Sequence, residues 1–193
     1  MKKLLIAAAA MLSFCFADAQ VYYLGFQENE FANTVGSSTH TEKAPGFVIG
    51  FGKNFEIADG LGIQPALELS LNTRKETTLG TDYKYNNFGV KLPIDINYGF
   101  ELGSVLKLGA YAGPTFYLGA VSNCKYDDDK YNFYEDDLNR FSIGVNGGIF
   151  CDIMDLLRVK VGYDKGLTNM LQDGDDDYKY KQNCWTIAVG YLF

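Results

Sequence analysis

The feature that most constrains the fold is a long run in which apolar and polar residues alternate. Every even position from Phe88 to Phe100 is aromatic or aliphatic, and every odd position from Gly89 to Glu101 is Gly, Pro, Asn or a charged residue. Successive side chains of a strand point to opposite faces. A period of two held over residues 88–101 therefore predicts one long strand with an apolar face and a polar face.

The same period recurs along the chain. With residues 88–101 it predicts eight strands, the others being at residues 21–26, 47–57, 61–71, 106–118, 141–149, 157–163 and 185–193. Short connections alternate with long polar ones: the short ones are residues 58–60, 102–104 and 152–155, and the long ones are residues 27–43, 73–82, 122–138 and 171–178. Short turns at one end and long loops at the other are typical of outer-membrane proteins. The predicted fold is all-β, an eight-stranded antiparallel up-and-down transmembrane β-barrel.

A soluble barrel of the lipocalin type would alternate in the same way, with its apolar face turned inward. Three features favour the membrane barrel. Glycines crowd the polar face, as a narrow lumen requires, and aromatic residues gather near strand ends, where interfacial girdles lie. An outward apolar face also encloses four cations and five anions, which can pair with one another. This predicted lumen charge network is Glu56, Glu68, Lys91, Asp95, Glu101, Lys107, Arg158, Lys160 and Asp164.

One charged residue, Lys53, falls on a predicted apolar face. It must either lie close enough to the interface to snorkel or sit at a bulge that shifts the register. Beyond the N-terminal segment, no apolar run approaches the ~18 residues of a membrane-spanning helix. The formal charge of −7 argues against nucleic-acid binding, which depends on clustered Lys and Arg.

The N-terminal segment has the pattern of a secretory signal peptide over residues 1–19. Lys2 and Lys3 precede an apolar stretch at residues 4–12, and small residues precede a predicted cleavage between Ala19 and Gln20. The barrel then comprises residues 20–193. A signal peptide followed by such a barrel predicts export to the outer membrane of a Gram-negative bacterium.

Three stretches resemble a known family: residues 88–94 (FGVKLPI), 163–169 (YDKGLTN) and 189–193 (VGYLF). Through them the chain from about residue 44 onward is similar to the PorT-like and porin-domain outer-membrane barrels common in Bacteroidota. The resemblance implies an eight-stranded barrel and no particular activity. The terminal Tyr191 and Phe193 also resemble the C-terminal signal recognised by the barrel-assembly machinery, which is the partner expected during biogenesis.

Residues with catalytic potential are few. The single His, His40, follows a Ser-Ser-Thr run at residues 37–39 in a predicted loop. A nucleophilic enzyme needs a base that a third group orients, and nothing near His40 in the sequence does so. We expect no catalytic residue and no cofactor, with a lipid A modifying enzyme as an alternative. Of the three cysteines beyond the signal peptide, only Cys124 and Cys184 fall near the same end of the predicted barrel, so they are the one pair considered for a disulfide.

Acidic and Tyr residues concentrate in two predicted loops, at residues 126–137 and 173–180. Asp173, Asp175 and Asp177 resemble the start of a Ca²⁺ loop, but Tyr178 and Cys184 stand where an EF-hand needs Gly and Glu. The three carboxylates are therefore weak Ca²⁺ candidates, and no metal site is predicted. Divalent cations bound here would bridge to lipopolysaccharide phosphates. The tyrosines suit either a contact surface or the upper aromatic girdle.

These observations predict an integral outer-membrane protein with a structural or surface-interaction role through acidic, Tyr-rich loops. Its expected surroundings are outer-membrane lipid and lipopolysaccharide. Eight strands leave an interior just wide enough for side chains, so we expect a plugged polar lumen without general diffusion. A small-solute channel is the alternative from another class.

Overall fold

The structure, a computed structural model, describes residues 21–78, 81–126, 129–174 and 177–193. Eight long strands form the wall of a barrel: β1 (Val21–Val35), β2 (Ser38–Gly52), β4 (Leu61–Thr78), β5 (Thr81–Leu102), β6 (Leu106–Tyr126), β8 (Phe141–Ile153), β9 (Leu157–Gly166) and β10 (Tyr178–Leu192). Three short elements are added to them: β3 (Phe55–Ala58), β7 (Asp129–Asn132) and α2 (Phe133–Asp136). The predicted signal peptide and its cleavage site lie outside the described residues.

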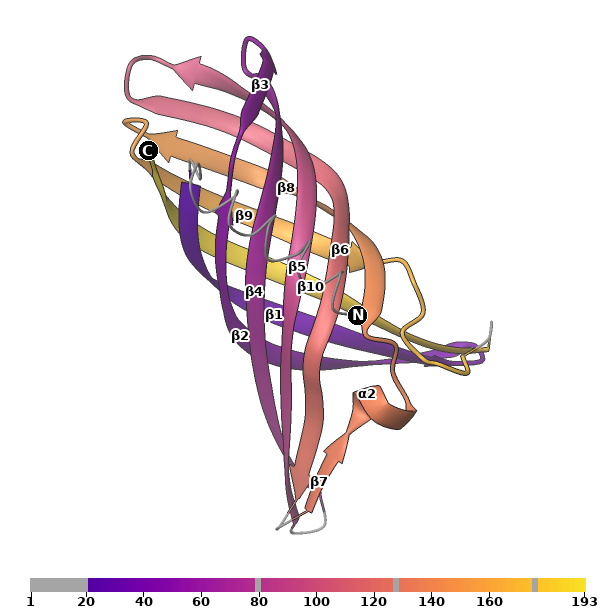
Figure 1. The fold of residues 1–193 in the computed structure, drawn as a ribbon. Coiled ribbons are helices and arrows are strands. Elements are labelled where there is room, and N and C mark those ends of the chain that lie inside the picture. Colours follow the sequence, from indigo (N-terminus) through magenta and orange to yellow (C-terminus); the bar gives the residue numbers. More distant parts are fainter. Residues whose placement is uncertain (1–20, 79–80, 127–128, 175–176) are drawn as a thin grey trace, which may run out of the picture.

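The wall closes on itself (Figure 1). Neighbouring strands pair antiparallel in chain order, and β10 returns to pair with β1. β3 continues β2 along β4, and β2 and β4 are themselves paired. The predicted eight-stranded antiparallel barrel is confirmed. No helix in the described part of the chain is long and apolar enough to cross a membrane.

Apolar side chains face outward and polar ones face inward. The outward side includes five aliphatic residues that are 56–64% exposed: Leu24, Ile49, Ile96, Ile149 and Ile187. Trp185 and Tyr163 meet at one border of this apolar belt, with ring centroids 4.7 Å apart, and Tyr191 and Phe193 meet at the other, 4.6 Å apart. Soluble monomers rarely expose so large an apolar surface. The belt therefore suits a bilayer with aromatic girdles at both interfaces.

Two short turns lie where they were predicted, and the third begins after Ile153, so that Asp152 belongs to β8. Gly60 and Gly103 adopt φ +73° in two of them, a conformation that glycine reaches without steric cost. Lys53 lies between β2 and β3, with its ammonium 5.6 Å from the Phe55 ring centre. The register of β3 on β4 shifts between Glu56 and Ala58. The predicted alternative of a bulge at Lys53 is therefore wrong, because the register shift lies beyond that residue.

Two predicted loops prove to be strand. β1 and β2 stay paired up to Val35 and Ser38, across a two-residue turn in which Gly36 has φ +58°, so residues 27–43 are a hairpin. β4 and β5 stay paired up to Thr78 and Thr81. The prediction failed because both faces are polar beyond the apolar belt. The ladder continues there, but the hydrophobic period that reveals it does not.

The extended hairpins form two blades at one end of the barrel (Figure 1). The β1–β2 blade comprises residues 27–43 with the start of β10, and the β4–β7 blade comprises residues 73–78 and 81–87 with residues 121–126 of β6 and 129–132 of β7. The pairing of β2 with β4 ends at Gly46 and Asn72, so beyond this point the blades separate. Residues 133–138 follow β7, and Leu138 forms an isolated bridge with Leu171 of the last connection.

Candidate functional site

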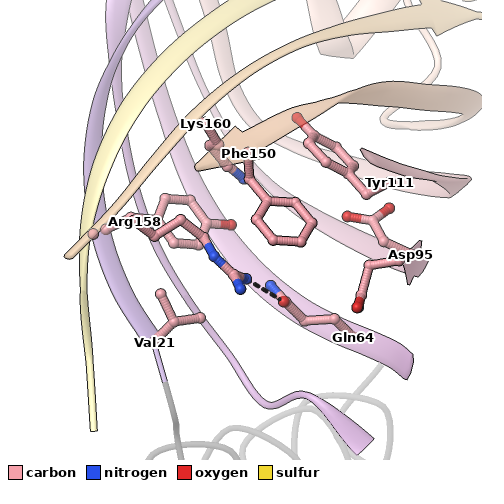
Figure 2. Close-up of a pocket in the computed structure, with 10 residues that line it drawn as sticks. Val21, Gln64, Asp95, Tyr111, Phe150, Arg158 and Lys160 are labelled. Atoms are coloured by element: carbon pink, nitrogen blue, oxygen red, sulfur yellow. Dashed lines mark hydrogen bonds between the residues drawn. The ribbon is translucent and has the colours of Figure 1, made fainter. Parts of the chain in front are cut away.

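The lumen is packed with hydrogen-bonded charges. Near the short-turn end, Arg158 Nε and Nη2 donate to the two carboxylate oxygens of Asp152 at 2.6 and 2.8 Å. Figure 2 shows the third bond, which Nη1 donates to Gln64 Oε1 at 2.8 Å. The guanidinium lies 4.3 Å from the Phe150 ring centre. Paired forks of this kind are the strongest and most directional ion pairs in proteins. Arg158 therefore ties β4 to β8 and β9 across the interior.

A second group of charges lies at the middle of the barrel. Glu68 accepts a hydrogen bond from the Tyr23 hydroxyl at 2.5 Å and one from Lys160 Nζ at 3.1 Å. Lys160 also lies 3.8 Å from the Tyr23 ring centre. Closer to the blades, Lys91 Nζ donates to Asp164 at 3.1 Å, and the Thr115 hydroxyl donates to the same carboxylate at 3.0 Å. Each cation is thus matched by an anion on another strand.

The polar packing continues toward the blades through amide side chains. Gln27 Nε2 donates to the Ser70 hydroxyl at 2.5 Å and to Asn72 Oδ1 at 2.7 Å, and Asn29 also donates to Asn72. Gln182 donates to Asn29 at 2.5 Å. Three cavities in the lumen have volumes of only about 20–30 Å³. Each has room for about one water molecule.

Six of the nine predicted lumen charges lie in this packing: Glu68, Lys91, Asp95, Arg158, Lys160 and Asp164. Lys107 is half-buried, and Glu56 and Glu101 are exposed close to the short turns. Asp152, which the sequence placed in a turn, is buried in the lumen instead. The alternation pattern could have assigned it to the inward face of β8, because it lies two residues after Phe150, which also points inward.

An apolar cluster closes the lumen at the blade end. It consists of Tyr117, Tyr134, Leu138 and Met170, with Phe133, Leu171 and Tyr180 packed against it. Tyr134, predicted as part of a contact surface, is buried in this cluster. Tyr117 also lines the lumen cavity nearest the blades. The cluster therefore separates the lumen from the space between the blades.

A cavity of about 320 Å³ lies between the blades, on the far side of this cluster from the lumen. β1, β2, β4, β5, β6 and β10 contribute to its wall, as do α2 and the two connections beside it. The lining residues are Phe31, Asn33, Glu42, Ala44, Arg74, Tyr85, Asn87, Ser122, Phe133, Asp137, Leu138, Leu171 and Tyr180. Pockets for small ligands usually measure about 300–1,000 Å³, so this one suits a single small ring system.

Arg74 is the central charge of the cavity. Its side chain is 16% exposed, forms an ion pair with Glu42 of the other blade, and lies 3.2 Å from Glu76. Its guanidinium lies 4.3 Å from the Tyr85 ring centre. Burial alone would lower the pKa of Arg74, but the Glu42 hydrogen bond and charge outweigh it and raise the pKa. Since two carboxylates face one guanidinium, the cavity carries no net positive charge.

Aromatic rings form two of the walls. Phe31 and Tyr180 stack with centroids 5.7 Å apart and planes 12° apart, and Tyr85 and Phe133 stack at 6.3 Å and 17°. Burial, followed by the charge of Glu42, raises the pKa of Tyr180. Tyr131 donates to Asp137 at 2.6 Å on the rim. The site thus combines flat apolar faces with amides, a hydroxyl, carboxylates and a guanidinium.

The other predicted site residues lie elsewhere. His40 is on β2 near the hairpin tip, 81% exposed, with Nε2 4.0 Å from a Glu42 carboxylate oxygen. Cys124 and Cys184 are both free and buried, so the considered pair is wrong. The two residues sit on β6 and β10, which β8 and β9 separate in the wall. Asp173 and Asp177 are exposed, whereas Asp175 is outside the described residues.

Comparison with known proteins decides what kind of barrel this is. The family described as "Outer membrane protein beta-barrel domain" matches residues 4–193, nearly the whole chain. The chain belongs to this family. The barrel is therefore an integral protein of the outer membrane of a Gram-negative bacterium. The end with short turns faces the periplasm and the blades are extracellular, as in other proteins of this kind.

Two solved structures with TM-scores of 0.50 or more show the same fold at low sequence identity. Neisserial surface protein A is 13% identical with a TM-score of 0.52, over 89% of this chain and 97% of that chain. Ail, the attachment invasion locus protein of Yersinia pestis, in complex with the heparin analogue sucrose octasulfate, is 11% identical with a TM-score of 0.50, over 91% and 99%. The outer membrane enzyme PagL is 10% identical with a TM-score of 0.48, over 86% and 99%. A search of curated protein sequences found no match.

Proposed function

We propose that this outer-membrane barrel is a non-catalytic surface protein that binds a neutral sugar ring of a glycan in the cavity between its blades. The observation that carries the proposal is the combination of two stacked aromatic pairs with planar polar side chains in one cavity of about 320 Å³. A sugar ring has apolar C–H faces, which pack on aromatic rings, and hydroxyls that both donate and accept. The cavity offers partners for both.

The charge of the cavity selects against polyanions. Ail is seen in complex with a heparin analogue, which is highly sulfated. In this barrel Arg74 is engaged by Glu42 and Glu76, and Asp137 adds another carboxylate to the rim. An incoming sulfate would have to break the Arg74–Glu42 pair in a partly buried place. A neutral ring requires no such exchange.

Two rival functions fit the geometry less well. A channel needs a continuous water-filled path, but the lumen cavities each hold about one water molecule and the cluster around Tyr117 closes them. Planar bilayers containing the barrel should show no discrete conductance. A lipid A modifying enzyme would need His40 to be oriented and shielded, and His40 is exposed on a hairpin tip. His40→Ala should leave lipid A composition unchanged.

Saturation-transfer NMR on the refolded barrel would test the binding proposal. The probes are a panel of neutral methyl glycosides, with sucrose octasulfate as the polyanion. Some glycosides should bind, and Tyr85→Leu and Phe133→Leu should each weaken them about tenfold, in line with the loss of one good packing contact. The matched control is Tyr126→Leu, since Tyr126 lies on the same blade but does not line the cavity.

Two results would contradict the proposal. One is a panel in which no neutral glycoside binds although the barrel is folded, as judged by its heat-modifiable gel migration. The other is tighter binding of sucrose octasulfate than of every neutral glycoside. Placement in the PorT-like branch of Bacteroidota, the role of Tyr191 and Phe193 in barrel assembly and the signal peptide stay predictions from the sequence.

A further inference from the structure

The outward face of the β4–β7 blade carries a row of lysines that the sequence does not reveal. Lys75 lies directly opposite Lys84, Lys84 lies opposite Lys125, and Lys125 lies opposite Lys130. The row crosses β4, β5, β6 and β7, and all four side chains are exposed. Neighbouring strands are about 4.8 Å apart, so the four lysines lie within roughly 15 Å of one another.

No ion pair in the described part of the chain neutralises this row. None of the four lysines forms an ion pair among residues 21–78, 81–126, 129–174 and 177–193. Glu76, the acidic residue next to Lys75, lies on the opposite face, 3.2 Å from Arg74, and Asp82, on the same face as Lys84, accepts a hydrogen bond from Thr77 at 2.6 Å. Like charges directly opposite each other on a sheet are destabilising. The row is therefore unfavourable for the barrel by itself.

Protection of sheet edges explains only half of the row. Lysines often keep exposed strand edges from pairing with another chain. Both β7 and the part of β4 beyond Asn72 are edges of this blade. Lys84 and Lys125 lie on the two central strands, where each is paired on both sides. No edge needs protection there, so the central lysines require another cause.

The height of the row suits the membrane surface. Lys75 lies four residues beyond Leu71, the last outward-facing apolar residue of β4, and Lys84 lies four residues beyond Phe88 of β5. Four residues of strand span about 13 Å, and strand tilts of 35–45° reduce this to about 10 Å above the apolar belt. Because a row across tilted strands is oblique to the membrane, its charges also lie at different heights.

We infer that this lysine row binds the phosphate groups of a lipopolysaccharide molecule of the outer leaflet. Lipopolysaccharide carries phosphates on its lipid anchor and further anionic groups on the adjoining sugars, so its charges rise from the membrane surface as the row does. Its acyl chains would pack on the apolar belt beneath, where Leu71, Phe88 and Val121 form one outward-facing row of their own. The inference does not depend on the proposed cavity site.

Native mass spectrometry of the refolded barrel with lipopolysaccharide of the lipid A and inner-core type would test this. The triple variant K75Q/K84Q/K125Q should bind about tenfold to a hundredfold more weakly, since each lysine near an anionic surface contributes roughly a factor of five. The matched control is K43Q/K179Q/K181Q, which removes the same charge from the β1–β2 blade. It should change binding by no more than about twofold.

Three further arms identify the ligand and the mechanism. Enzymatically dephosphorylated lipopolysaccharide should bind the wild type as weakly as the intact form binds the triple variant. Binding should persist in EDTA, because lysines contact phosphate directly, whereas a divalent bridge from the acidic loops would be lost. Free inorganic phosphate should not compete, because it lacks the acyl chains.

The inference is overturned if the control variant weakens binding as much as the triple variant, if EDTA abolishes binding, or if dephosphorylated lipopolysaccharide binds normally. Heat-modifiable migration checks that each variant is folded, and the single variants Lys84→Gln and Lys125→Gln serve if the triple variant is not. Neutral glycoside binding should be unchanged in all of them. Loss of one activity without the other therefore separates this inference from the proposed function.

Discussion

The two extracellular blades have similar strand ladders but differ in how their outward-facing lysines are paired. On the β1–β2 blade, Lys43 lies opposite Glu30, and its ammonium is 2.7 Å from Glu28 and 3.7 Å from Glu30. The Glu28 hydrogen bond raises the pKa of Lys43. On the β4–β7 blade, Lys84 has a lysine opposite it on each side.

This difference shows that strand pairing alone does not require a row of like charges. The same molecule builds a neighbouring blade in which a lysine is neutralised by glutamates, and cross-strand pairs of opposite charge are the more stable arrangement. Between the blades, on their inner faces, Glu42 and Arg74 form an ion pair. The inward guanidinium of Arg74 is thus neutralised within the chain, whereas the outward lysines of the β4–β7 blade form no ion pair among the described residues.

The largest effect on stability is expected in the lumen, where charges are buried, in contrast to the exposed charges of both blades. Asp164→Asn would leave the Lys91 ammonium buried without its anion, and uncompensated buried charges cost about 3–5 kcal/mol. Urea unfolding of the barrel in lipid vesicles would measure the loss. Asp95→Asn is the control, because Asp95 forms no ion pair among the described residues and one of its oxygens has no hydrogen-bond partner there. A similar loss in both variants would contradict the packing described for the lumen.

An intermediate effect is expected where the blades meet. Arg74→Met keeps an apolar stem over Tyr85 but removes the pair with Glu42, and hydrogen bonds to charged groups contribute about 1.5–3 kcal/mol. Amide hydrogen exchange in residues 74–78 and 81–85 should become faster as the blades open. Lys181→Met, on the outward face of β10, is the comparison variant. Unchanged exchange in Arg74→Met would mean that the ladders alone hold the blades.

The smallest effect is expected from exchanging the outward charges. Lys84→Glu would place an anion between Lys75 and Lys125, and opposite-charge pairs across strands contribute roughly 0.2–1 kcal/mol each. The β4–β7 blade should become more stable to proteolysis while lipopolysaccharide binding falls. Glu30→Lys is the mirror variant, since it puts a lysine opposite Lys43 and should make the β1–β2 blade easier to cleave. If Lys84→Glu destabilised its blade, the lysine row would not be a source of repulsion.

Most of the barrel wall was predictable because the bilayer imposes a strict rule. Each strand must present apolar side chains to lipid, and a one-residue slip would turn them inward, so a period of two appears in the sequence wherever lipid is contacted. The run from Phe88 to Phe100 shows this plainly. The same rule placed Glu68, Lys91, Asp164 and other charges on the inner face, where the structure pairs them.

The sequence by itself thus determined which segments cross the membrane and which of their faces meets lipid. Only the tertiary structure decided what happens beyond the bilayer, where both faces are polar and the period disappears. Phe31, Glu42, Arg74, Tyr85 and Tyr180 come from five strands and meet in one cavity. The lysines likewise form a row only through the register of four strands. The physical reason is that water accepts polar side chains on either face, so partners outside the membrane are set by pairing register, which no local pattern records.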